Sequence, residues 1–141
     1  MRNIQKIILH CSATTTLMDI NAETIREWHV KGNGWADIGY NYVIKRDGTL
    51  ENGRDLDGDG DSEDEIGAHA AGFNTHSLGI CLVGGIDHEG NPDSNFTRAQ
   101  YETLFGLHDY LKQKYPKAQF IGHRDISSKA CPSLDAKALF N

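Results

Sequence analysis

The chain has 141 residues, a length that suits one compact domain able to bury a core without disulfides. Its composition is ordinary for a globular protein, and no apolar run approaches the ~20 residues of a membrane-spanning helix, so membrane insertion is excluded. The net charge is -6, but residues 55–65 hold seven acidic residues and no basic one. The rest of the chain has 13 acidic and 14 basic residues, and no basic stripe indicates a nucleic-acid partner.

The N-terminus lacks the apolar stretch of a signal peptide, so we expect synthesis in the cytoplasm and release by another agent before any action outside the cell. An odd number of cysteines without a secretion signal argues against a disulfide framework. Cys81 lies in an apolar run and is expected to be a buried, inert thiol. Cys131 lies in a polar stretch before Pro132 and is a better candidate for chemistry.

The first half of the chain predicts a strand, a helix and a hairpin. Residues 6–11 form a short apolar run that ends in small polar residues, which predicts a buried strand. Residues 21–31 predict a helix whose first residue, an asparagine, can cap its N-terminus. Residues 40–45 and 49–51 predict a hairpin that turns at Asp47-Gly48.

The second half predicts two more strands and two helices. Residues 77–84 predict a second buried strand. Thr97 and Gln100 form a capping-box pattern, which predicts a helix that runs until the next proline. Residues 119–121 predict a short strand, and residues 134–140 a last short helix.

Strands interleaved with helices predict one α/β domain over residues 1–141, which some schemes would class as α+β, with a central sheet flanked by helices. The hairpin makes that sheet mixed rather than purely parallel. No internal repeat or linker divides the chain.

Three residues of the types that bind zinc stand at strand ends or in loops, where function gathers. His10 closes the first strand, His123 follows the late strand, and Cys131 lies in the loop after it. Two imidazoles and a thiolate form a reasonable zinc set, and three protein ligands leave the fourth position open for water, as in catalytic sites. The alternative is that His10 simply ends a strand and that His123 pairs with Asp125.

Six stretches resemble, in order, those of the type-2 N-acetylmuramoyl-L-alanine amidases, a family that includes amidase-type phage lysozymes and the peptidoglycan-recognition proteins of animals. These stretches are residues 10–14, 39–49, 67–70, 79–87, 95–97 and 129–133. The resemblance implies a zinc hydrolase that cleaves the amide bond between N-acetylmuramic acid and L-alanine of peptidoglycan, in the role of a phage or prophage endolysin.

The resemblance also assigns residues to roles. It implies that one zinc ion is bound by His10, His123 and Cys131, that Tyr40 and Lys129 are catalytic, and that His69 contacts substrate. The chain departs from the phage lysozymes in three places, one of which is a shorter segment before His10. Arg124-Asp125 replaces a His-Glu pair, and the acidic segment 55–65 is largely an insertion.

Both catalytic assignments have plain structural alternatives. Tyr40 can orient a water molecule or donate a proton to the leaving amine, or it can simply pack on the core. Tyr42 has the same strand parity and is expected to face the same side, so the residues leave the choice open and the resemblance selects Tyr40. Lys129 is expected to stabilise the tetrahedral intermediate, and its alternative is a solvated surface lysine. Trp28 is expected in the core, and Trp35 is left open.

The acidic segment follows the front half of a calcium-binding EF-hand loop. Acids occupy the first, third, fifth and seventh places, at Asp55, Asp57, Asp59 and Asp61. Gly60 stands at the sixth place, but Ile66 stands at the twelfth, where a glutamate is expected. The segment is either a solvated acidic loop or a weak calcium site that orders one wall of the active-site cleft, with the acids of residues 63–65 as altered ligands.

Two other functions remain open at this stage. A peptidoglycan-binding module without catalysis is disfavoured by Cys131, because its thiolate completes the zinc set. A structural zinc domain is disfavoured because no fourth protein ligand is apparent. Peptidoglycan is the expected partner, and we expect a monomer.

Overall fold

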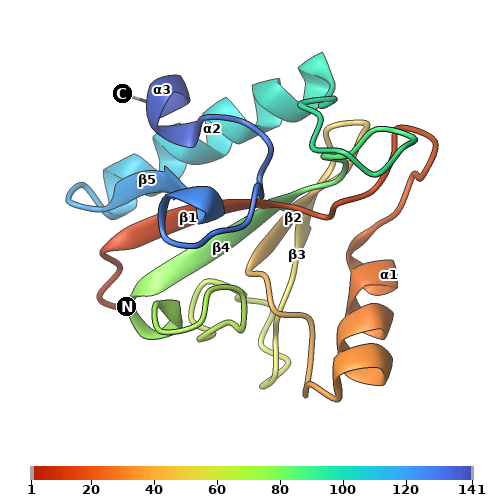
Figure 1. Cartoon of the computed structure of the whole chain (residues 1–141). Coiled ribbons are helices and arrows are strands. Elements are labelled where there is room, and N and C mark those ends of the chain that lie inside the picture. Colours follow the sequence, from red (N-terminus) through yellow and green to blue (C-terminus); the bar gives the residue numbers. More distant parts are fainter. Residues whose placement is uncertain (1, 141) are drawn as a thin grey trace.

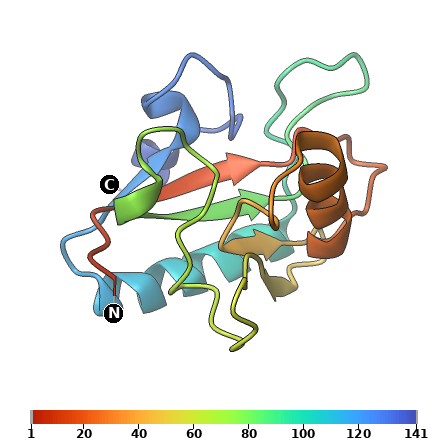
Figure 2. The same ribbon diagram turned by 90° about the horizontal axis from the view of Figure 1, so that it is seen from below.

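A five-stranded sheet in the order β3-β2-β4-β1-β5 forms the centre of the computed structural model, which describes residues 2–140. The strands are β1 (Lys6–Cys11), β2 (Tyr42–Ile44), β3 (Leu50–Asn52), β4 (Ser77–Leu82) and β5 (Gln119–Gly122). Neighbouring strands are parallel except for β2 and β3, which form the antiparallel hairpin. Figure 2 shows β1 and β4 side by side and pointing the same way. The predicted mixed sheet is therefore confirmed.

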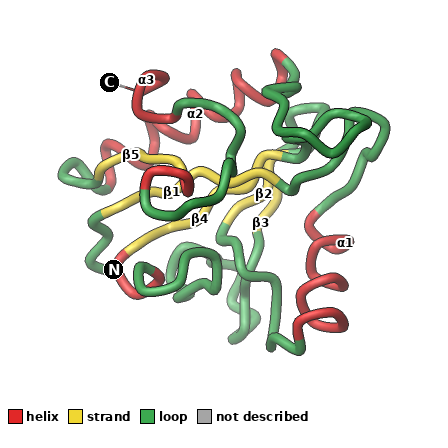
Figure 3. Tube along the Cα trace, viewed as in Figure 1, coloured by secondary structure: helices red, strands yellow, loops and turns green. Residues whose placement is uncertain are grey.

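The helices cover both faces of this sheet (Figure 1). They are α1 (Ala22–Glu27), α2 (Arg98–Lys114) and α3 (Ala136–Phe140), with a π-helical turn η1 (Trp28–Gly32) and the 3-10 turns η2 (Asn74–His76) and η3 (His123–Asp125). No helix in residues 2–140 is both long and apolar enough to cross a membrane. Much of the rest of the chain is loop (Figure 3).

Both main helices begin where the sequence predicts. The Asn21 side chain accepts a hydrogen bond of 3.0 Å from the backbone N–H of Thr24 and caps α1. At the start of α2, the backbone N–H of Gln100 donates to the hydroxyl of Thr97 at 3.1 Å, and the Gln100 side chain accepts from the Thr97 N–H at 2.9 Å. The helix predicted over residues 21–31 is a regular α-helix only up to Glu27, and the chain then continues as the π-helical turn η1.

Alternation along β1 decides which side chains face which layer. Ile7 and Leu9 belong to the core cluster under α2, together with the fully buried Leu104 and Leu111 of that helix. Burying each such leucine contributes roughly 2–3 kcal/mol. The next residue along, Ile8, packs in a separate cluster on the opposite face. Because His10 shares the parity of Ile8, it also faces away from α2.

Two sequence expectations about aromatic residues are wrong. Tyr42 packs in the cluster under α2, whereas Tyr40 packs against the cluster on the α1 side. Tyr40 lies before β2 begins, so strand alternation does not reach it. Trp28 is 41% exposed rather than part of the core, because the π-helical turn carries it to the surface.

A buried carboxylate ties the acidic segment to the sheet and to α2. Glu63 is only 5% exposed and accepts hydrogen bonds from the hydroxyls of Tyr42, Tyr110 and Tyr115. The ammonium of Lys114 forms an ion pair with it at 2.9 Å. The acidic segment is therefore anchored at Glu63 by a network that no local pattern in the sequence predicts.

Candidate metal centre

The topology brings the three expected metal ligands together. His10 lies near the carboxyl end of β1, and His123 directly follows the neighbouring parallel strand β5. Cys131 returns from the loop after η3, where the backbone N–H of Cys11 donates to its sulfur at 3.2 Å. One ligand atom from each of the three residues lies within 4.8 Å of the other two. This spacing lets one ion contact all three.

His10 connects this cluster to a second imidazole behind it. The His10 side chain is 1% exposed, and its Nδ1 lies 3.8 Å from the sulfur of Cys131. Its Nε2 lies 2.9 Å from Nδ1 of His69, and Nε2 of His69 lies 3.2 Å from the hydroxyl of Ser77. The chain of contacts therefore runs from the ligand cluster to the start of β4.

The ring of His69 fits there because β4 has a glycine beside it. A Cβ atom at Gly79 would lie 2.6 Å from the His69 ring, so any larger residue would displace the imidazole. The side chain of Asn74 fixes the backbone by accepting from the N–H groups of His69 and Ala70 at 3.0 and 2.9 Å. His69 is 8% exposed, and both of its ring nitrogens face protein groups rather than an open cleft.

The electrostatic environment keeps these imidazoles neutral. Burial lowers the pKa of His10 well below its usual value, and the neighbouring His69, His123 and Lys129 lower it further. Burial, then the nearby His123, lowers the pKa of His69 to about 3, and burial also lowers the pKa of His123. Neutral imidazole is the form that binds metals, so two nitrogens and one thiolate fit a zinc ion.

The alternative explanation for His123 finds no support in the geometry. The carboxylate of Asp125 accepts a hydrogen bond of 2.7 Å from the backbone N–H of Gly122 and helps to close η3. No hydrogen bond or ion pair within residues 2–140 joins Asp125 to the ring of His123. His123 is thus left facing His10, with ring centroids 4.6 Å apart.

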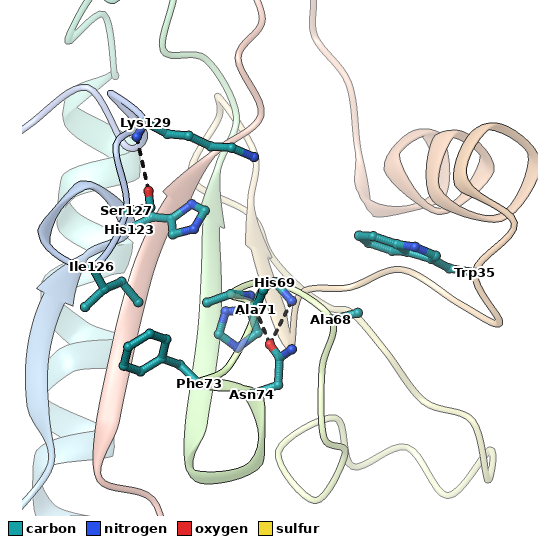
Figure 4. A pocket seen from close by; sticks show the side chains of 11 residues that line it. Trp35, Ala68, His69, Ala71, Phe73, Asn74, His123, Ile126, Ser127 and Lys129 are labelled. Carbon is teal, nitrogen blue, oxygen red and sulfur yellow. Dashed lines mark hydrogen bonds between the residues drawn. The ribbon is translucent and has the colours of Figure 1, made fainter.

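A cleft opens over the ligand cluster in two adjoining parts. The inner part has a volume of about 320 Å³ and is lined by the three ligands and by Tyr40, His29 and Lys129. The outer part, about 420 Å³, shares His69, His123, Lys129 and Trp35 with it and adds Phe73 and Ile126. Figure 4 shows Trp35 across the cleft from His123 and Lys129, with Phe73 and Ile126 together on another wall.

Both expected catalytic side chains reach this cleft. The ring of Tyr40 lies 5.1 Å from that of His10, and burial, reinforced by the thiols of Cys81 and Cys131, raises the Tyr40 pKa well above its usual value. Tyr40 is therefore a hydrogen-bond donor at neutral pH. Lys129 is exposed and extends over His123 toward the opening (Figure 4).

His29 also lines the cleft, although the sequence alone gave no reason to assign it a role. Its ring centroid lies 5.5 Å from that of Tyr40 and 4.7 Å from that of Trp35. Its Nδ1 accepts a hydrogen bond of 2.9 Å from the N–H of Gly39, which leaves Nε2 as the protonated nitrogen. The turn after η1 brings these residues together, and no spacing pattern along the chain reveals it.

The chain is similar in sequence to one protein family and to phage endolysins. A family model described as N-acetylmuramoyl-L-alanine amidase matches residues 1–134. The endolysin of Klebsiella phage KP32 is 48% identical over 132 residues, which cover 94% of this chain and 82% of that endolysin. The endolysin of Escherichia phage T7 is 47% identical over 131 residues, covering 93% and 82%.

A solved structure agrees with these sequence matches. The endolysin N-acetylmuramoyl-L-alanine amidase LysCS from Clostridium intestinale superimposes with a TM-score of 0.75 at 28% identity, covering 95% of this chain and 78% of that one. The family match spans all five strands and all three ligand positions.

Proposed function

This chain belongs to the N-acetylmuramoyl-L-alanine amidase family and hydrolyses the amide bond between N-acetylmuramic acid and L-alanine of peptidoglycan; we propose that it does so with one zinc ion held by His10, His123 and Cys131. The observation that carries the proposal is the convergence of those three ligand atoms within 4.8 Å at the floor of a cleft. The family is zinc-dependent in general, and the donor set suits zinc.

When bound there, zinc supplies an acidified water molecule and a Lewis acid for the scissile carbonyl. Lys129 presents an ammonium group over the same space and stabilises the negative charge that develops on the carbonyl oxygen. A well-placed donor of this kind is worth roughly 3–4 kcal/mol. Tyr40 keeps its phenolic proton at neutral pH, so it can orient a water molecule or donate a proton to the leaving amine.

The hydrogen bonds of His69 support a positioning role beside the substrate contact that the resemblance implies, since His69 also lines both parts of the cleft. With Nδ1 of His10 toward the metal, Nε2 of His10 carries its proton and donates to His69. His69 then donates from its own Nε2 to Ser77. Such outer contacts fix the tautomer and the ring orientation of a metal ligand. His69 therefore acts on the reaction through His10.

The cleft also fits the two parts of the substrate. Trp35, Phe73 and Ile126 provide apolar walls, which suit the faces of sugar rings and the aliphatic parts of a peptide. The protein acts as a monomer on the wall after release from the cytoplasm of an infected cell, in the role that the endolysin relatives carry in their names.

Digestion of purified peptidoglycan tests the proposal. We expect release of peptides with a free L-alanine amino terminus, loss of this activity with a strong zinc chelator, and recovery when zinc is returned. Cys131→Ser should bind wall but release no peptide. A module that only binds peptidoglycan would release nothing under any condition, and activity that survives thorough metal removal would refute the zinc mechanism.

A further inference from the structure

The acidic loop, defined as residues 55–65, gathers its side chains instead of spreading them into solvent. Carboxylate oxygens of Asp55, Asp57 and Asp59 lie within 4.8 Å of one another, and so do those of Asp57, Asp64 and Glu65. Asp57 belongs to both groups. Like charges this close repel one another, so the arrangement needs a compensating cation or some other constraint.

Glu65 and Asp55 are the two members of these groups that are not exposed. Glu65 is 8% exposed, and within residues 2–140 nothing donates a hydrogen bond to its carboxylate or forms an ion pair with it. One oxygen of Asp55, Oδ1, is buried without any partner, while Oδ2 accepts from the N–H of Gly60 at 2.9 Å. A buried, unpaired carboxylate oxygen such as Oδ1 of Asp55 is costly unless a cation occupies the space that it faces.

The basic residues nearby give their hydrogen bonds to other groups, and Arg2 acts on the carboxylates of Asp64 and Glu65 through its charge alone. The guanidinium of Arg2 donates to the carbonyls of Glu63 and Glu65 and of three residues in the segment 74–77. Arg54 donates to the carbonyls of Ile38 and Ile66, and Lys114 pairs with Glu63. In the part of the chain that the structure describes, no ion pair includes any member of the two carboxylate groups.

The loop reaches this arrangement through its glycines. Gly58 and Gly60 have φ angles of 68° and 80°, which other residues rarely adopt, so the chain turns sharply between successive aspartates. The twelfth place, where an EF-hand loop carries its glutamate, is the exposed Ile66. Glu65 and Asp64, one and two residues earlier, instead return to Asp57.

We propose that the acidic loop binds one calcium ion centred on Asp57. The ligands come from the five carboxylates of Asp55, Asp57, Asp59, Asp64 and Glu65. Calcium–oxygen distances of about 2.3–2.6 Å place two oxygens on one ion at most ~5 Å apart, which matches both groups. Many carboxylates in an irregular arrangement favour calcium over magnesium, which requires a regular octahedron. Asp61 belongs to neither group of three, so we leave it out of the ligand set.

Calcium there would also order one wall of the active-site cleft. The loop leads directly into Ala68 and His69, which line the cleft, and the carbonyl of Ile66 is held by Arg54. Any effect of calcium on turnover depends on the proposed amidase function. The binding itself does not, so the two proposals fail separately.

Calorimetric titration of the zinc-loaded full chain tests the site. Protein prepared in calcium-free buffer is titrated with calcium chloride or with magnesium chloride, and thermal unfolding is followed in parallel. We expect one calcium ion per chain with a dissociation constant on the order of 10 μM to 1 mM. At a calcium concentration a hundred times that constant, the unfolding temperature should rise by roughly 5 °C or more.

Two variants with the same change of charge make the test specific. Asp57→Asn should lose calcium binding, yet without calcium it should be at least as stable as the parent because repulsion is relieved. Asp19→Asn, at an exposed aspartate outside the loop, should bind calcium like the parent. The proposal would be overturned if calcium gave no binding heat and left the unfolding temperature unchanged. It would also be overturned if magnesium bound equally well, or if Asp57→Asn still bound calcium.

Discussion

Tyr40 and Lys129 line the cleft without belonging to the proposed ligand set, and we propose that both act on the substrate. Both line the inner part of the cleft beside the ligand cluster. Neither is a ligand, so their removal should leave metal binding intact. This separation between chemistry and metal binding can be measured residue by residue.

Tyr40→Phe and Lys129→Ala should each lower turnover on peptidoglycan by about 10²–10³-fold, the usual cost of losing one transition-state donor. Zinc content, measured by elemental analysis, should stay near one ion per chain. Normal turnover in either variant would remove that residue from the mechanism, and loss of zinc would mean that its role is structural.

The contact between His10 and His69 makes a different prediction. His69→Ala should weaken zinc binding by roughly 10–100-fold, measured by competition with a chromogenic chelator, because His10 loses the acceptor that fixes its ring. Ser77→Ala should act in the same direction with a smaller effect, and Ser94→Ala, at an exposed serine, should have none. A raised KM with unchanged zinc affinity in His69→Ala would instead indicate a direct contact with substrate.

At the level of elements, the acidic loop, α2 and β2 meet at one buried carboxylate. Burial alone would raise the pKa of Glu63, but the hydrogen bonds from Tyr42 and Lys114 outweigh it and lower the pKa overall. A lowered pKa in the folded state means that the carboxylate stabilises the protein above its unfolded value of ~4.3. That contribution is lost as the pH falls through the folded pKa.

Glu63→Gln should therefore lower the free energy of unfolding by about 2 kcal/mol at neutral pH, because it removes the charge that three hydroxyls and Lys114 share. Urea unfolding between about pH 7 and pH 3 should show a shallower acid-dependent loss of stability than in the parent. Glu89→Gln, at an exposed site, serves as the control. An unchanged acid dependence in Glu63→Gln would contradict this assignment.

The elements that the sequence predicts well are those with a local physical signal. Residues 6–11 form an apolar run and become β1, and the Thr97–Gln100 capping box begins α2 where expected. The errors come from long-range packing. Tyr40 lies outside its strand, and Trp28 lies on a π-helical turn, so neither alternation nor helical periodicity describes its environment.

The same distinction applies to the site. Ligand types at strand ends suggested His10, His123 and Cys131, and the fold brings them together. The partnership of His69 with His10 depends on the close approach that Gly79 allows, and the position of His29 depends on the turn after η1. Such contacts join residues far apart in the chain, so no spacing rule predicts them.

For the whole molecule, the sheet order explains why the side chains of the three proposed ligands lie close together. β1 and β5 are neighbours and run parallel, so their carboxyl ends present His10 and His123 side by side. Packed clusters on both faces hold these strands. The loop carrying Cys131 is joined to β1 through the N–H of Cys11, so the sulfur returns to the same edge. The convergence of the three proposed ligands is thus a consequence of topology.

Anomalous diffraction at the zinc edge, from crystals grown with zinc, tests this account most directly. We predict one strong peak about 2.0–2.1 Å from a nitrogen of His10 and of His123 and about 2.3 Å from the sulfur of Cys131, with no fourth protein ligand. A zinc peak elsewhere would contradict this account. So would zinc-saturated crystals in which these three side chains share no ion, if the same protein preparation hydrolyses peptidoglycan in solution.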